Sequence, residues 1–569
     1  MNPIILTKPS VSSVFLFLFL FLFLFGPSTT TRVFGSAELW QQQQHPEKSS
    51  AAGQPQATPD IEALRNQAVA QENQEHYLDA VETYRAILRI QPDDRDSLRR
   101  CGEIFLHLGR WDEAARALRQ AVQLQPNVES YIKLGTAYFY LKRFTDSVDA
   151  YRNASRLDPA NAQVHFHLSG TYAMLGKYPE SAEEARQAVQ ASPKFAEAYN
   201  RLGLAYSQLD RHADAAEAYL KAVRIKPSYA EAYNNLGLAY SQMGRYEDAI
   251  SAYKEAIRLK PDLVDAHANL GVAYFSSGHS SEAVESSKAA IRLKGEDPEF
   301  YSNLGMVFAN LGNLEQALES YRQVVRLHPD SPEGYNGLAA AYAGLGRYPE
   351  AIEAFQQVLR LSPVSAEAHA NLGVMYAKTN RHQEAIGEFQ NAIRLKPALT
   401  SVYSKLAAEY AALHQWADAV RNYEQLIRAQ PSEWRPHYQL AVTFQQMRQW
   451  EQAIRELVTA SKLNPNDTLS LAAVGYIYAI TGRARDAQRV LDNLQRRARS
   501  EEVSPLRFAV IYSGLGKRDQ VLKTIQQAVA GNAPCVGSIK VDPRFDRFRS
   551  DPKFASLVKS LDAPPCTEY

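Results

Sequence analysis

Cysteine is scarce in this chain, and charge of neither sign is in excess. The three cysteines, Cys101, Cys535 and Cys566, are too few and too scattered for a metal site or a disulfide framework. The 63 lysines and arginines nearly balance 62 aspartates and glutamates, so the composition gives no indication of nucleic-acid binding. Cys101 is expected to be a small buried apolar residue. Cys535 and Cys566 could pair if the compartment is oxidising.

Catalytic signatures are missing as well. The sequence contains no HExxH, no paired CxxC, no P-loop and no GxSxG motif. His165 and His167 are two residues apart, so on a helix they point to different faces and do not easily share a metal ion. The sequence therefore predicts a protein that is not an enzyme, with no catalytic residue, no metal and no cofactor.

Long apolar runs are absent except for one near the N-terminus, at residues 14–25. A helix of this length covers about 18 Å, well short of the roughly 30 Å hydrocarbon core of a bilayer. A short apolar run behind Lys8 is typical of a secretory signal peptide, with Gly35 and Ala37 at the two key positions for cleavage after Ala37. The alternative is an uncleaved membrane anchor through residues 14–25.

The sequence does contain a repeat. Residues 230–261, AEAYNNLGLAYSQMGRYEDAISAYKEAIRLKP, return in altered form at a step of about 34 residues, which is typical of a helix–turn–helix unit. Gly237 and Ala249 are expected where the two helices of a unit touch, and Gly244 is expected to adopt a left-handed turn. The prolines that end successive copies are Pro92, Pro126, Pro159, Pro193, Pro227, Pro261, Pro329, Pro363, Pro397, Pro431 and Pro465.

This pattern resembles the signature of the tetratricopeptide repeat family almost position for position. The resemblance implies an all-α fold, a right-handed superhelical solenoid of antiparallel helix pairs. Some copies depart from the pattern at the turn glycine, where Asp and Asn tolerate a left-handed backbone better than His or Arg. The residues that replace this glycine are Asp210, Asn380, His414 and Arg448.

Four segments follow from these observations. Residues 1–37 are predicted to be a signal peptide or membrane anchor, and residues 38–60 a disordered polar linker. Residues 61–531 are predicted to hold about fourteen repeats, of which the last two are degenerate. Residues 532–569 are expected to form a cap and tail, in which Asp542-Pro543 and Asp551-Pro552 each begin a helix. This tail is similar to endings that follow repeat arrays in many bacterial proteins.

In the family that the chain resembles, the first helix of each repeat lines a concave wall that binds peptides. The resemblance points to a row of asparagines at the sixth position of these helices, similar to the asparagine ladder in the repeat domain of O-linked N-acetylglucosamine transferase. An amide side chain can both donate to and accept from a peptide backbone. The alternative is that Asn is simply common at this position in idealised repeats. The candidate peptide-binding residues are Asn235, Asn269, Asn303 and Asn371.

Two other rows of residues recur along the first helices. The row at the second position is interpreted as structural, and the row at the ninth position does not suit a C-terminal carboxylate. A carboxylate recurs at the second position of the first helices, where it favours the helix dipole. The ninth positions are apolar where the chaperone-type carboxylate clamp needs Asn, so that clamp is not expected. The acidic row is Glu197, Glu231, Asp265, Glu299, Glu333 and Glu367. The ninth row includes Leu204, Leu238, Val272, Met306, Ala340 and Val374.

The sequence thus favours a protein–protein interaction scaffold of bacterial origin that binds an extended peptide or protein segment, with no nucleic acid as partner. Its location is expected to be periplasmic or secreted. The alternative is an accessory or sensor subunit of an envelope complex, anchored to the membrane through residues 14–25.

Overall fold

The structure, a computed structural model, describes residues 60–531, 533–559 and 561. Every regular element in these residues is a helix, and they contain no strand. The described chain divides into two compact units, one ending at Leu311 and the other beginning at Gly312. We call them the N-terminal unit and the C-terminal unit. Residues 1–59 lie outside the described residues, so the signal peptide or anchor and the linker stay predictions.

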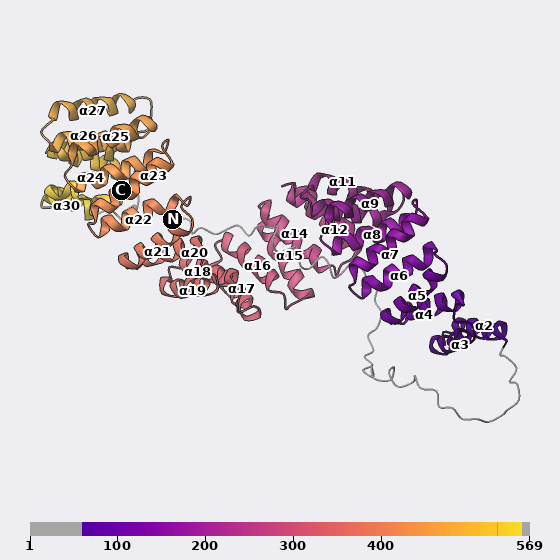
Figure 1. Cartoon of the computed structure of the whole chain (residues 1–569). Coiled ribbons are helices and arrows are strands. Elements are labelled where there is room, and N and C mark those ends of the chain that lie inside the picture. The colour runs from indigo at the N-terminus through magenta and orange to yellow at the C-terminus, as the bar shows by residue number, and fades with distance from the viewer. Residues whose placement is uncertain (1–59, 532, 560, 562–569) are drawn as a thin grey trace. The chain divides into compact units, whose positions relative to one another are not determined.

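The N-terminal unit consists of seven consecutive helix pairs and one further first helix. Figure 1 shows these helices following one another in chain order. The helices are α2 (Ile61–Asn73), α3 (Tyr77–Ile90), α4 (Arg95–His107), α5 (Trp111–Leu124), α6 (Val128–Tyr140), α7 (Phe144–Leu157), α8 (Ala162–Met174), α9 (Tyr178–Ala191), α10 (Ala196–Ser207), α11 (His212–Ile225), α12 (Ala230–Gln242), α13 (Tyr246–Leu259), α14 (Val264–Ser276), α15 (Ser280–Leu293) and α16 (Pro298–Asn310).

The C-terminal unit begins with one second helix, continues with six helix pairs and ends in a short tail. Its helices are α17 (Leu314–Leu327), α18 (Pro332–Gly344), α19 (Tyr348–Leu361), α20 (Ala366–Lys378), α21 (His382–Leu395), α22 (Ser401–Ala412), α23 (Trp416–Ala429), α24 (Trp434–Gln446), α25 (Trp450–Leu463), α26 (Thr468–Ile480), α27 (Ala484–Arg497), α28 (Pro505–Gly514) and α29 (Arg518–Ala530). The tail holds the 3-10 helices η1 (Val536–Lys540) and η2 (Pro543–Phe548), and α30 (Pro552–Lys559). The predicted all-α fold of helix pairs is confirmed.

A ring packed on a glycine brings the two helices of a repeat together. In the α12/α13 pair, the Tyr253 ring lies so close to Gly237 that a Cβ there would stand 2.6 Å from the ring. Tyr253 is 1% exposed, and Ala249 on the same helix is fully buried. The same packing places Tyr151 on Gly135 and Tyr219 on Gly203. The packing of the ring therefore requires a glycine at position 237, as it does at positions 135 and 203.

The turn between the two helices uses a left-handed residue, as predicted. Gly244 has φ +72° with open space around it. Asp210, Asn380, His414 and Arg448 have φ between 56° and 57°, so the turn geometry persists even where the side chain disfavours it. The sequence did not reveal two more copies of this turn, at Glu75 and Lys142.

The tail packs against the last helix pair. Asp542 accepts a hydrogen bond from the Arg544 amide, and Asp551 accepts from the Lys553 amide, so each aspartate caps the short helix that follows it. Phe545 and Phe554 are 1% exposed and join the core of α28 and α29. Cys535 is disulfide-bonded. The third cysteine, Cys566, lies outside the described residues, so its pairing stays a prediction.

Two glycine-to-alanine changes should shift stability in opposite directions. Gly237→Ala forces the new Cβ into the Tyr253 ring and should lower the free energy of unfolding by about 1–3 kcal/mol. Gly387→Ala in α21 meets nothing within 4 Å and should raise it by about 0.5–1 kcal/mol, because Ala is the better helix former. Urea unfolding with hydrogen exchange measures both changes. Equal effects of the two substitutions would contradict the ring-on-glycine packing.

Candidate functional site

The first helices of successive repeats contact one another as well as their own partners. In the N-terminal unit, α4 contacts α6, α8 contacts α10, and α10 contacts α12. No two second helices make a comparable contact within the described residues. Because the stack is closer on the side of the first helices, that side is the concave one within each unit. We call the surface formed by α4, α6, α8, α10, α12, α14 and α16 the inner wall.

The sixth residue of each first helix lies at the seam between neighbouring first helices. Lys133 of α6 reaches Glu103 of α4 at 2.6 Å, and the Asn235 amide of α12 donates to Asn200 of α10 at 3.0 Å. Along the inner wall this row changes from basic residues to amides. The row reads Arg100, Lys133, His167, Arg201, Asn235, Asn269 and Asn303.

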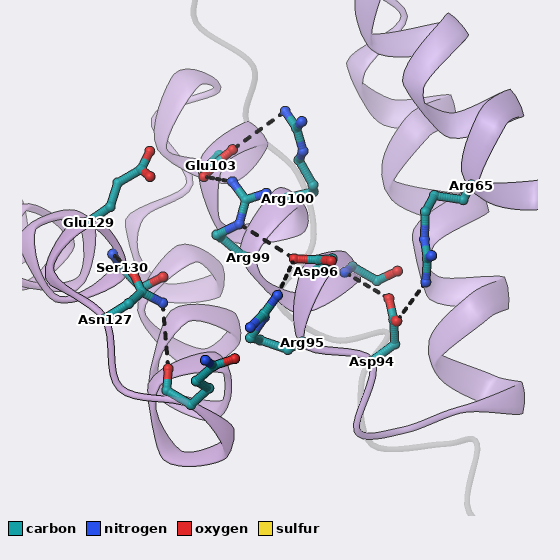
Figure 2. A network of polar contacts seen from close by, with 12 residues as sticks. Arg65, Asp94, Arg95, Asp96, Arg99, Arg100, Glu103, Asn127, Glu129 and Ser130 are labelled. Atoms are coloured by element: carbon teal, nitrogen blue, oxygen red, sulfur yellow. Dashed lines mark hydrogen bonds and ion pairs between the residues drawn. The ribbon is translucent and has the colours of Figure 1, made fainter. Parts of the chain in front are cut away.

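The first two cations of the row are neutralised by carboxylates. Arg100 lies 3.4 Å from Glu72 and 3.8 Å from Glu103, and Lys133 contacts Glu103 at 2.6 Å and Glu129 at 2.5 Å. Figure 2 shows Glu103 of α4 beside Arg99 and Arg100 of the same helix, with Glu129 on α6. At this end, the inner wall therefore satisfies its own charges.

The next guanidinium in the row has no such partner. Arg201 makes no ion pair or hydrogen bond to any side chain or backbone atom of the described residues. Its guanidinium carbon lies 4.8 Å from the centre of the Phe166 ring, and Nη1 lies over Gly170, 3.1 Å from where a Cβ would stand. Burial lowers the pKa of Arg201 below its usual value. The charge of Arg201 is thus partly desolvated and uncompensated, although its side chain remains partly exposed.

His167 stands beside this guanidinium on α8. Its ring stacks on Tyr151 at 5.3 Å between centroids, and its Nε2 lies 3.0 Å from Gln163 Nε2. Burial and the positive charge of Arg201 lower the pKa of His167 to about 4. The imidazole is therefore neutral at pH 7, and Nδ1 makes no hydrogen bond within the described part of the chain.

A shallow pocket of about 560 Å³ opens at the N-terminal ends of α8 and α10, and its lining includes neither His167 nor Arg201. Gln163, which contacts His167, forms part of its lining. So does Phe195, whose ring lies 4.9 Å from that of Phe166. One side chain therefore separates the pocket from His167, and the Phe195 and Phe166 rings lie between the pocket and Arg201.

The ninth residues of the first helices complete the inner wall. In α4, α6 and α8 they are Glu103, Thr136 and Gly170. From α10 onward they are apolar and partly exposed, beginning with Leu204 and Leu238. Arg201 thus lies where the ninth residues change from polar or small side chains to apolar ones.

Family models support the repeat assignment. Models of the tetratricopeptide repeat match residues 65–129, 132–194 and 342–410. The model of the cilia and flagella-associated protein 70 C-terminal domain matches residues 165–371. These stretches coincide with consecutive helix pairs of the structure. The chain belongs to the tetratricopeptide repeat family. Repeat solenoids present extended concave surfaces for binding, and the chain accordingly has a protein–protein interaction role.

Solved structures similar to this tetratricopeptide repeat protein include MamA, YrrB and the Cut9–Hcn1 complex. MamA protein is 31% identical over 30% of this chain and 92% of its own, with a TM-score of 0.28. YrrB, described as a TPR protein with an unusual peptide-binding site, is 27% identical over 32% of this chain and 94% of its own, with a TM-score of 0.29. The APC/C hetero-tetramer Cut9–Hcn1 matches at 15% identity over 74% of this chain and 97% of its own, with a TM-score of 0.34. No curated protein matches the chain.

The predicted asparagine row is more buried than a ligand-binding row requires. Asn235, Asn269 and Asn371 are 2%, 7% and 3% exposed, whereas Asn303 is partly exposed. Asn235 and Asn269 donate to Asn200 and Asn234 of the preceding first helices, at 3.0 and 3.2 Å. These hydrogen bonds join neighbouring repeats. A role for the four asparagines in peptide binding stays a prediction, and Asn303 is the one with accessible surface.

Other residues that the sequence singled out have structural partners. Glu197, Glu231 and Glu367 accept hydrogen bonds from Lys226, Lys260 and Lys396, in addition to lying in the first turn of a helix. His165 is 4% exposed, with Nδ1 2.6 Å from Glu184 and Nε2 3.0 Å from the Pro159 carbonyl oxygen. Cys101 is 3% exposed, and burial raises the pKa of its thiol to about 12, so it is the inert core residue that was predicted.

Sequence reasoning missed Arg201 and the environment of His167. The row of sixth residues was read only where it contains Asn, although the same spacing leads back through Arg201 and His167 to Arg100. That periodicity was available as a signal. The absence of a partner for Arg201 was not, since it depends on three-dimensional neighbours. In the described part of the chain, no three His, Cys, Asp or Glu side chains are placed to hold a metal ion, and no helix is long and apolar enough to cross a membrane.

The pH dependence of stability tests Glu299, a member of the acidic row at the second position of the first helices that has no lysine hydrogen-bond partner within the described residues. Burial, Asp297 and Asp265 together raise the pKa of Glu299 from 4.5 to about 7. The folded state therefore favours protonated Glu299, whose stabilising contribution is complete below pH 4.5 and is lost as the pH rises through 7. Glu299→Gln should raise the free energy of unfolding by about 1–3 kcal/mol at pH 8 and leave it nearly unchanged at pH 4.

The matched control is Glu197→Gln. Burial of Glu197 opposes its ionisation, but the hydrogen bond from Lys226 prevails and lowers its pKa. Glu197→Gln should therefore destabilise the protein at neutral pH, opposite to Glu299→Gln. Thermal melts between pH 4 and 8 measure both variants. A Glu299→Gln variant that is less stable than wild type at pH 8 would contradict the pKa assignment.

The unpaired guanidinium should also affect stability. Arg201→Met removes a desolvated charge with no carboxylate partner and should raise the free energy of unfolding by about 0.5–1 kcal/mol. Lys133→Met should lower it, because Glu103 and Glu129 lose the ammonium group between them. Urea unfolding compares the two variants. If Arg201→Met destabilises as much as Lys133→Met, the guanidinium has a stabilising partner within the protein.

Proposed function

We propose that this protein is a non-enzymatic scaffold that binds an extended peptide or protein segment along its inner wall. The observation that carries the proposal is the composition of that wall from α8 onward. There an unpaired cation is followed by partly exposed apolar ninth residues and, on α16, by the partly exposed amide of Asn303. Apolar side chains contribute affinity, whereas polar groups at fixed spacing orient a peptide backbone.

The proposed location is outside the cytoplasm, periplasmic or secreted. Two observations support it: the apolar run at residues 14–25 behind Lys8, and the disulfide at Cys535. Disulfides persist in oxidising compartments and are rare in the cytosol. A membrane-anchored accessory or sensor subunit of an envelope complex is the second candidate, favoured by the same apolar run if it is not cleaved. N-terminal sequencing of the mature protein separates the two, since cleavage would leave Glu38 as the first residue.

Peptide selection tests the scaffold proposal directly. The full-length protein is immobilised, and a random peptide library displayed on phage is selected against it. Leu238→Lys places a charge among the apolar ninth residues and should weaken binding of the selected peptides by about tenfold or more, because apolar burial is lost. Fluorescence anisotropy with the selected peptides measures the affinities.

The matched control is Ile225→Lys. Ile225 is 36% exposed on the second helix α11, away from the inner wall, so this variant should bind like wild type. Failure to select any peptide, or equal weakening by both substitutions, would contradict a peptide-binding inner wall.

A further inference from the structure

The residues at the sixth position of α6, α8 and α10 are Lys133, His167 and Arg201, and they differ in whether a carboxylate lies beside them. Lys133 has two carboxylates within 2.6 Å, whereas His167 is neutral and Arg201 has no anionic partner in the described residues. A guanidinium presents its N–H groups in a planar fork that matches a carboxylate. The inner wall therefore supplies carboxylates to the cation of one repeat and none to Arg201, two repeats further along.

The surroundings of Arg201 hold the fork in place without using its hydrogen-bonding capacity. The Phe166 ring lies 4.8 Å from the guanidinium carbon, and Gly170 leaves room beside Nη1 that no larger residue would leave. An aromatic face attracts the cation but accepts none of its N–H bonds in the guanidinium plane. The donors of Arg201 have no acceptor in the described residues, and the side chain is partly exposed, so they remain available to an incoming acceptor.

We propose that Arg201, with His167 beside it, forms an anion subsite that binds the side-chain carboxylate of an Asp or Glu in an extended peptide. This inference rests on the proposed function and specifies the chemistry of its ligand. The subsite differs from the chaperone-type carboxylate clamp in that the ninth positions beside it, Leu204 and Leu238, are apolar and not Asn. A single guanidinium beside a neutral imidazole matches one negative charge, whereas a phosphate group carries up to two at pH 7.

The residues on either side of Arg201 determine the direction in which the peptide binds along the inner wall. Toward α12 and α14, the ninth residues Leu204, Leu238 and Val272 are apolar and partly exposed. Toward α6 and α4, the wall is charged and already neutralised by its own ion pairs. The preferred peptide therefore carries an acidic residue with apolar residues on one side of it, the side that faces α12.

Selection with a charge-neutral variant tests the subsite. Full-length wild type and Arg201→Gln are each selected against the random peptide library. Peptides from the wild type should be enriched in Asp or Glu next to apolar residues, and those from Arg201→Gln should not. The matched control is Arg224→Gln, an exposed arginine on the second helix α11, which should retain the enrichment.

Affinity measurements give the quantitative test. Replacing the acidic residue of a selected peptide by its amide should weaken binding to wild type about tenfold to a hundredfold, the range of a charge-assisted bidentate pair. The amide peptide should bind wild type and Arg201→Gln equally. Arg201→Lys, which keeps the charge without the fork, should give an intermediate affinity for the acidic peptide. Circular dichroism melts confirm that each variant is folded.

The pKa of His167 provides a readout that a purely structural role for Arg201 would not move. Tyr151 of α7, Gln163 of α8 and Arg201 of α10 are the polar groups whose contacts or charge act on this ring. A bound carboxylate compensates the charge of Arg201, so NMR titration should show a higher His167 pKa with the acidic peptide than with its amide analogue.

Each outcome distinguishes the subsite from the scaffold. Peptides selected without acidic enrichment, or an acidic peptide that binds Arg201→Gln as tightly as wild type, would overturn the subsite and leave the scaffold in place. Failure to select any peptide would overturn the proposed function and the subsite with it.

Discussion

The close approach of the two helices in each repeat is the constraint on which the rest of the structure depends. In several repeats a glycine on the first helix packs against a ring from the second, as Gly237 packs against Tyr253, and no β-carbon fits between them. This contact fixes the helix pair as a unit. Stacking of such units then places the same position of every first helix on one side, which is how an inner wall with rows of equivalent residues arises.

Because the rows are equivalent, differences within a row are informative. A repeat array is stabilised mainly by contacts within repeats and between nearest neighbours, so a residue at the seam must satisfy its polar groups locally. Lys133 does so with Glu103, and Asn235 does so in part with Asn200. Arg201 has no acceptor for its N–H groups among the described residues, although its guanidinium packs on the Phe166 ring of the preceding first helix. Packing on a ring does not use those donors, and this is the ground for the proposed anion subsite.

The sequence was sufficient for the fold and insufficient for the site. Small residues such as Gly237, and the regular spacing of helix-ending prolines, report local geometry that each repeat must satisfy by itself. A periodic pattern therefore reveals them. The burial of Asn235 and the isolation of Arg201 depend on how neighbouring first helices meet, which no single repeat encodes. The asparagine row was consequently interpreted as accessible when most of it is buried, and the arginine in the same row was overlooked.

The tyrosine on the glycine also makes three repeats, those of Tyr151, Tyr219 and Tyr253, optical reporters of their own integrity. Burial raises the pKa of Tyr253, as it does for Tyr151 and Tyr219, and the rise is far above the usual range of a phenol. These phenols therefore stay protonated at an alkaline pH at which exposed tyrosines have ionised, and they absorb as phenolates only after the helix pair has separated. Ultraviolet absorbance during an alkaline titration thus distinguishes intact repeats from opened ones without any added label.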